Sequence, residues 1–140
     1  MEYDKKALEL YNSGYNCAQA VVCAFCGAKN IDFDTVMKIA APFGRGITAG
    51  RELCGAVSGM CMAVGMMCAG QCGDPIAQAN VICVTHALVE KFRQQFHSIT
   101  CRELLERQSE SCTVQCTEFI EYAARILAEQ LKKHDDMKKI

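Results

Sequence analysis

Apolar side chains recur every three to four residues along most of the chain, the spacing that places them on one face of an α-helix. Within residues 2–13 this face carries Tyr3, Ala7, Leu10 and Tyr11. We find no comparable stretch with the two-residue alternation of a half-buried strand. The pattern therefore predicts an all-α fold, a single-domain bundle of about six helices with short connections, over residues 1–140.

Capping residues indicate where several helices begin. Asn16 followed by Gln19 has the form of a capping box. Asp32 is suited to cap a short third helix, and Asp74 with Pro75 is suited to begin a long one. The apolar residues of that long helix are Ile76, Ala79, Val81, Cys83, Ala87, Leu88 and Phe92. Their number predicts that this helix is mostly buried.

The segment Leu53–Gly70 is eighteen residues long and carries no charge. Its length is compatible with a membrane span. However, four glycines, three cysteines and Ser58 make it much less lipophilic than a typical span, and no Trp or Tyr flanks it. We therefore expect a central helix, rich in Gly, Cys and Met, that the other helices bury on all sides. A membrane location is disfavoured.

Charge and composition argue against a nucleic-acid partner and favour association with a second copy of the chain. Lys and Arg number 15 against 16 Asp and Glu, and the basic residues are not clustered, so nucleic-acid binding is disfavoured. Hydrophobic residues make up 51% of this short chain, which favours apolar surface beyond one core. We therefore expect a homodimer.

Eleven of the 140 residues are cysteines, several times ordinary usage. The first residues, MEYDKK, do not resemble a signal peptide, so a cytoplasmic location is expected. An odd number of cysteines also leaves at least one unpaired in any intramolecular disulfide scheme. In a reducing compartment, clustered thiols are typical of catalysis, redox sensing or metal binding rather than of a disulfide scaffold. Sulfur chemistry is therefore the leading hypothesis.

Four segments carry a resemblance to a known family: GYNCAQAV, CGAVSG, FHSITCREL and CTEFIEYAA. Together they resemble the redox-active proteins of the C_GCAxxG_C_C family over about residues 3–128. The match implies that the family cysteines are Cys17, Cys54, Cys101 and Cys116, with Cys112 a competitor for the last place. Where the family motif reads Gly-Cys-Ala, this chain reads Cys-Gly-Ala. A related domain occurs in split-Soret cytochromes, so the resemblance implies redox or iron–sulfur chemistry.

Helix geometry limits which cysteines can act together. If residues 51–70 form one helix, each of Cys54, Cys61 and Cys68 lies about 10.5 Å along its axis from the next, too far for a disulfide. A redox pair must therefore form between different elements. The four family cysteines come from four predicted elements, so we expect them to converge at one site.

Cys54 is the residue we expect to be the nucleophile or central ligand. It lies near the start of its predicted helix, three residues after Arg51 and beyond Arg45 in the preceding loop. A helix N-terminus and nearby cations both lower the pKa of a thiol. Arg51 is therefore also the candidate to hold an anionic ligand or cofactor there. The plainer alternative is a small buried residue at a helix crossing.

Two functions fit these residues. In the first, Cys54 exchanges disulfides or passes electrons with Cys17, Cys101 or Cys116, and an unidentified redox protein is the partner. In the second, the same four thiolates ligate an iron–sulfur cluster or a zinc ion. A helical interaction module with incidental thiols is a third possibility. The sequence does not name a substrate or settle whether the protein is an enzyme.

Overall fold

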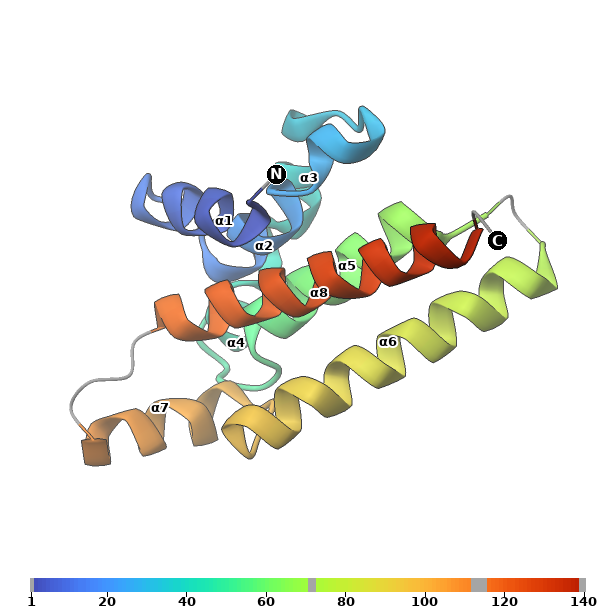
Figure 1. Cartoon of the computed structure of the whole chain (residues 1–140). Coiled ribbons are helices and arrows are strands. Elements are labelled where there is room, and N and C mark those ends of the chain that lie inside the picture. The colour runs from blue at the N-terminus through green and yellow to red at the C-terminus, as the bar shows by residue number, and fades with distance from the viewer. Residues whose placement is uncertain (1, 71–72, 112–115, 139–140) are drawn as a thin grey trace.

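The computed structural model describes residues 2–70, 73–111 and 116–138 and is all-α, as predicted. Over these residues the only strand-like pairing is an isolated antiparallel bridge between Leu53 and Thr100. Two short 3₁₀ turns, η1 (Cys26–Lys29) and η2 (Ala41–Phe43), flank the third helix. The helices are α1 (Tyr3–Asn12), α2 (Cys17–Cys23), α3 (Phe33–Ala40), α4 (Arg45–Thr48), α5 (Gly55–Cys68), α6 (Pro75–Phe96), α7 (Cys101–Ser111) and α8 (Cys116–Lys138) (Figure 1).

The helix starts predicted from capping residues are confirmed. The Asn16 side chain accepts a hydrogen bond from the backbone N–H of Gln19 at 2.9 Å, and Gln19 accepts one from the N–H of Asn16 at 3.0 Å. Asp32 caps α3 through the N–H of Thr35, and Asp74 caps α6. These contacts occupy amides that have no partner within the helix, which explains why such residues fix helix boundaries.

The α5 helix is the centre of the molecule. It packs against α2, α6 and α8, and its first six residues, Gly55–Met60, are all buried. Gly59 allows the closest approach, because a Cβ atom there would lie 2.5 Å from the carbonyl oxygen of Ala18 in α2. The uncharged segment forms the predicted central helix, from Gly55 to Cys68. Burial is complete only over these first six residues and at Ala63 and Val64, and the rest of the helix is half-buried.

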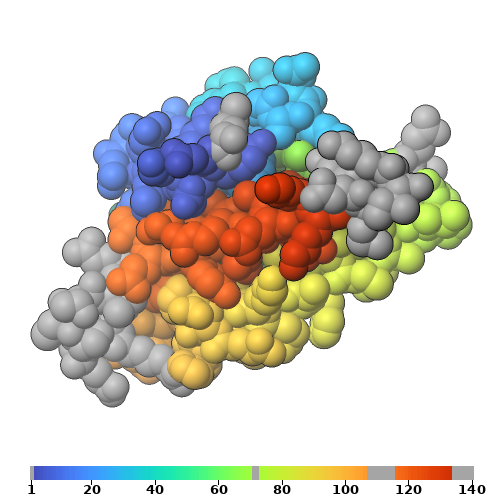
Figure 2. Space-filling view, viewed as in Figure 1, coloured from blue at the N-terminus to red at the C-terminus, as the bar shows by residue number. Residues whose placement is uncertain are grey.

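The long helix α6 differs from its prediction. Only Val84, Leu88 and Phe92 are buried, whereas Ile76 is 81% exposed and Ile82 62% exposed. Ala79, Cys83 and Ala87 are exposed as well. The reason is position: α6 runs along one edge of the molecule and packs on α5 and α8 from one side only (Figures 1 and 2). Apolar residues therefore outnumber the neighbours available to bury them.

An aromatic cluster joins α6 to the beginning of α8. Phe96 lies edge-on to Phe119, with ring centroids 4.8 Å apart, and also contacts Tyr122. Phe92 completes the cluster from one turn earlier in α6. Such pairs are worth about 0.5–1.5 kcal/mol each beyond burial. They fix the first turns of α8 against the rest of the bundle.

None of the described helices is sufficiently long and apolar to span a lipid bilayer. The structure contains one chain, so the expected homodimer stays a prediction.

Candidate functional site: a cysteine-lined pocket

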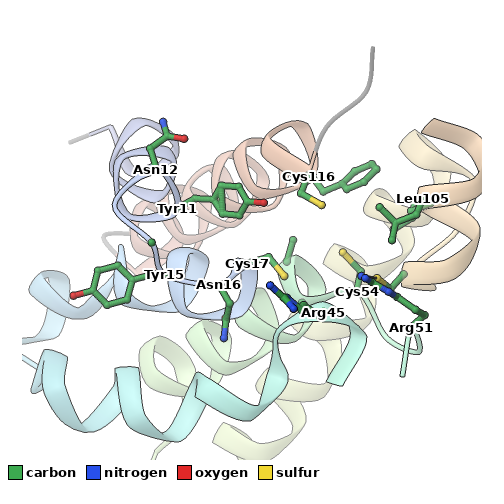
Figure 3. Close-up of a pocket in the computed structure, with 16 residues that line it drawn as sticks. Tyr11, Asn12, Tyr15, Asn16, Cys17, Arg45, Arg51, Cys54, Leu105 and Cys116 are labelled. Carbon is green, nitrogen blue, oxygen red and sulfur yellow. Dashed lines mark hydrogen bonds between the residues drawn. The ribbon is translucent and has the colours of Figure 1, made fainter. Parts of the chain in front are cut away.

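A pocket of about 580 Å³ opens where α1, α2, α5, α7 and α8 meet (Figure 3). All four cysteines singled out from the sequence line it: Cys17, Cys54, Cys101 and Cys116. The structure therefore brings together residues that are up to 99 positions apart in the chain. Cys112, the competitor of Cys116, lies outside the described residues.

Each of the four cysteines lies at the beginning of a helix. Cys17, Cys101 and Cys116 are the first residues of α2, α7 and α8, and Cys54 is the N-cap of α5. Backbone amides at a helix start lack partners within the helix and carry partial positive charge. The starts of α5, α7 and α8 therefore favour negative charge in the pocket.

Backbone pairing holds Cys54 and Cys101 side by side. The N–H of Cys54 donates to the carbonyl of Ile99 at 2.8 Å, and the N–H of Cys101 donates to the carbonyl of Glu52 at 2.6 Å. These bonds flank the bridge between Leu53 and Thr100, so the two cysteines are diagonal neighbours on one face of it. The bridge joins the start of α5 to the start of α7.

Gly55 brings Cys17 close to the beginning of α5. A Cβ atom at position 55 would overlap the Sγ atom of Cys17 and lie 3.2 Å from the backbone nitrogen of Ala18. Only glycine therefore fits beside Cys17 at this position. In Figure 3 the Cys17 side chain points into the pocket between Cys116 and Arg45.

The segment before α5, which includes the short element α4, is a left-handed turn. Five consecutive residues have positive φ: Arg45 (54°), Gly46 (63°), Ile47 (68°), Thr48 (48°) and Ala49 (73°). The N–H of Ala49 donates to the carbonyl of Arg45 at 2.9 Å, which closes one turn. For each residue other than glycine, this conformation costs about 1–2 kcal/mol. Arg51, with φ of 59°, follows shortly after.

This turn places both arginines on the pocket. Arg45, the first residue of the turn, and Arg51, shortly after it, both line the pocket (Figure 3). The Arg51 Nη1 atom lies 3.7 Å from the Cys101 Sγ atom and donates to it. Gly46 allows the turn to approach, because a Cβ atom there would lie 2.8 Å from the Cβ of Cys101. The sequence placed Arg51 beside Cys54; in the structure it contacts Cys101.

The expected lowering of the Cys54 pKa is wrong. Cys54 is only 5% exposed, and burial, followed by the neighbouring Cys17, raises its pKa to about 12. Hydrogen bonds from the N–H groups of Ala56 and Val57 act in the opposite direction, as a helix start should, but they do not overcome burial. Sequence proximity to Arg51 could not reveal how deeply the thiol is buried.

Tyr11 is a pocket residue whose role the sequence did not indicate. Its hydroxyl interacts with the sulfur of Cys116 and helps to stabilise the thiolate form. Burial, followed by Cys17 and Cys101, raises the pKa of Cys116, while Tyr11 and Arg51 lower it. Burial and Cys116 together raise the pKa of Tyr11. A tyrosine on the inner face of the first helix resembles a core residue in sequence, so no local signal distinguishes it.

The four thiols fit some inorganic groups better than others. Among the residues that the structure describes, no three His, Cys, Asp or Glu side chains are grouped so that they could hold one metal ion. A closed zinc site needs about four ligands around one point. An iron–sulfur cluster places several atoms between its thiolates. Such clusters are held by four cysteine thiolates, and four cysteines line this pocket.

The remaining cysteines lie away from the pocket. Cys23 and Cys26 are buried in the core, and each influences the pKa of the other. Cys61 and Cys68 are half-buried on α5, and Cys83 is exposed on α6. No two of the described cysteines are joined by a disulfide. Cys72 lies outside the described residues.

Fold and site together define an all-α, cysteine-rich protein with its thiols gathered at one pocket. Residues 15–130 match the family model described as "Putative redox-active protein (C_GCAxxG_C_C)", and the chain belongs to this family. A comparison with curated proteins gave no match. A comparison with solved structures gave none either.

Proposed function

We propose that the protein performs thiol–disulfide redox chemistry in the cysteine-lined pocket. The observation that carries the proposal is the gathering of four thiols around one cavity, with the guanidinium of Arg51 on one of them. In this reaction two thiols lose two electrons and two protons and form one disulfide bond. A disulfide substrate accepts the electrons, and a separate redox protein returns them in a reducing compartment such as the cytoplasm.

Cys101 is the attacking thiol in this proposal. The Arg51 guanidinium donates to its Sγ atom, so negative charge on this sulfur is stabilised where it develops. Cys54 is the resolving thiol, because it is the diagonal neighbour of Cys101 across the bridge. It stays protonated in the resting protein, and the amides of Ala56 and Val57 stabilise its thiolate when it reacts.

Cys17 and Cys116 form the outer part of the site. Both are half-buried rather than buried. Cys17 and Cys101 both act electrostatically on Cys54 and on Cys116. These interactions support a site in which a disulfide passes from one thiol to another by thiol–disulfide exchange.

An iron–sulfur cluster is the second candidate function. It is favoured by one thiol on each of four helices and by the two arginines on the pocket. When bound, such a cluster would supply one-electron transfer, with Cys17, Cys54, Cys101 and Cys116 as ligands. The helix starts and Arg51 would then offset the negative charge of the thiolates.

Anaerobic purification separates the two candidates. For the dithiol, we expect a colourless protein whose thiol count falls by two on mild oxidation, with a disulfide linking Cys101 to Cys54 in the peptide map. Cys101→Ser should abolish that loss, whereas Cys83→Ser, a change on the exposed face of α6, should not. Visible absorbance with stoichiometric iron and sulfide, lost in Cys101→Ser, would contradict the dithiol and support the cluster.

A further inference from the structure

The pocket is positively charged and holds no counter-charge of its own. Arg45 and Arg51 line it, and none of its lining residues is an Asp or Glu. Within the part of the chain that the structure describes, neither arginine forms an ion pair with a carboxylate. Two arginines outside the pocket do: Arg93 pairs with Glu90, and Arg125 with Glu121. The charge in the pocket is therefore available to a ligand.

The depth of the inner thiols limits the size of a substrate. Cys54 is 5% exposed and Cys101 is 9% exposed, so access to these sulfurs favours a small molecule over the surface disulfide of a folded protein. A pocket of about 580 Å³ lies within the usual range for small-molecule sites. Its walls combine apolar Leu104, Leu105 and Phe119 with the polar groups of Tyr11 and Asn16.

We propose, on the basis of the proposed thiol function, that the pocket takes a small organic disulfide bearing carboxylate groups, and that Arg45 recognises a carboxylate. Arg45 is exposed at the rim, while Arg51 is already bonded to Cys101. A guanidinium binds a carboxylate through two parallel hydrogen bonds, which fixes the orientation of the substrate as well as its charge.

The reaction balances without any further reagent. The Cys101 thiolate attacks one sulfur of the substrate disulfide, the substrate S–S bond breaks, and one thiolate leaves and takes up a proton. Cys54 then loses its proton and attacks the Cys101 sulfur of the mixed disulfide. The second substrate thiolate leaves and is protonated in turn. Two protein thiols and one small disulfide thus become one protein disulfide and two small thiols.

Two probes with the same skeleton test this proposal. One is 3,3′-dithiodipropionate, a dianion, and the other is its neutral dimethyl ester. Reduced protein is mixed with each probe, quenched with acid and alkylated, and the rate of modification is read at each cysteine by peptide mass spectrometry. Exposed Cys83, which lies outside the pocket, is the internal reference for the intrinsic reactivity of each probe.

We expect the dianion to be preferred over the ester at Cys101 by about tenfold relative to Cys83, since one charged hydrogen-bonded contact is worth roughly that factor. Arg45→Gln should remove most of this preference, and Arg45→Lys should retain part of it. Arg93→Gln, which removes an arginine outside the pocket, should leave it within about twofold. High salt should weaken the preference, because it screens charges near the surface.

Two outcomes would overturn the proposal, and they are distinguishable. If the dianion and the ester react equally at Cys101 in the unmodified protein, the anionic substrate is wrong while the thiol function stands. If Cys83 reacts and none of the pocket thiols does, the thiol function itself is wrong. The first comparison needs no variant, so it holds even if Arg45→Gln disturbs the left-handed turn.

Discussion

The two ends of α2 place cysteines in opposite surroundings. At the beginning of the helix, Cys17 is half-buried and its side chain points into the pocket beside Arg45. At the other end, Cys23 is 1% exposed, and burial raises its pKa to about 12. Cys23 and Cys26 form the CxxC pattern that sequence motifs associate with redox activity, yet they lie in the core. Position relative to the pocket, rather than spacing in the sequence, therefore distinguishes Cys17 from the core cysteines Cys23 and Cys26.

The largest effect should come from changing the residue against which Cys17 packs. In Gly55→Ala the added Cβ overlaps the Sγ atom of Cys17 and lies 3.2 Å from the backbone nitrogen of Ala18, so the Cys17 side chain must rotate and the backbone of α2 must adjust. We expect the free energy of unfolding to fall by about 2–3 kcal/mol. Gly65→Ala, the same change in the same helix, meets no atom within 4 Å and should instead stabilise by about 0.5–1 kcal/mol. Chemical denaturation of both variants measures the difference, and equal values would contradict the close packing at Gly55.

A change at the core end of α2 should lower the stability of the protein without altering the redox chemistry of the pocket. Cys23→Ser places a hydroxyl among apolar side chains, and we expect a loss of about 2 kcal/mol in the free energy of unfolding. Disulfide formation in the pocket should be unchanged. Cys83→Ser is the control, since a change at an exposed position should cost less than about 0.5 kcal/mol. Loss of pocket redox activity in Cys23→Ser would mean that the two ends of the helix are chemically linked.

The buried thiol of Cys23 should also make the stability of the protein depend on pH. The pKa of Cys23 is about 12 in the fold against an ordinary value of 9.0. Between these values the unfolded chain releases this proton while the folded chain keeps it, so stability falls as pH rises. The slope for this thiol approaches about 1.4 kcal/mol per pH unit. Cys23→Ala should reduce the slope of the unfolding free energy above about pH 9 by that amount. An unchanged slope would show that Cys23 ionises equally in both states.

The smallest effect concerns the cap beside Cys17. Asn16→Ala removes the hydrogen bond to the Gln19 amide and should cost about 1 kcal/mol. It should also raise the rate at which iodoacetamide alkylates Cys17, because the first turn of α2 opens more often. Asp74→Ala removes the cap of α6, which lies outside the pocket, and should cost a similar amount without changing Cys17. If both variants change the alkylation of Cys17 equally, the effect is one of overall stability.

Local signals in the sequence predicted much of this fold. The spacing of apolar residues indicated the helices, and Asn16, Asp32 and Asp74 indicated where three of them begin, because capping depends on residues within one turn. The four pocket cysteines were found from family resemblance and from one thiol per predicted element. Their placement around one pocket was an expectation that depended on the whole fold.

Features that depend on distant contacts were not predictable in the same way. The burial of Cys54 depends on how α2, α7 and α8 close around it, and the contact of Arg51 with Cys101 depends on a bridge between segments almost fifty residues apart. The exposure of Ile76 and Ile82 depends on which side of α6 lacks a neighbour. Periodicity identifies apolar residues but does not say what covers them.

The left-handed turn before α5 has a consequence for protein engineering. Ile47 is half exposed and β-branched, the kind of side chain least suited to positive φ, and Thr48 shares both properties. Glycine at either position would adopt the same backbone without steric penalty. This segment is therefore a place where thermal tolerance can be raised without repacking the interior, provided that the two arginines on either side keep their places.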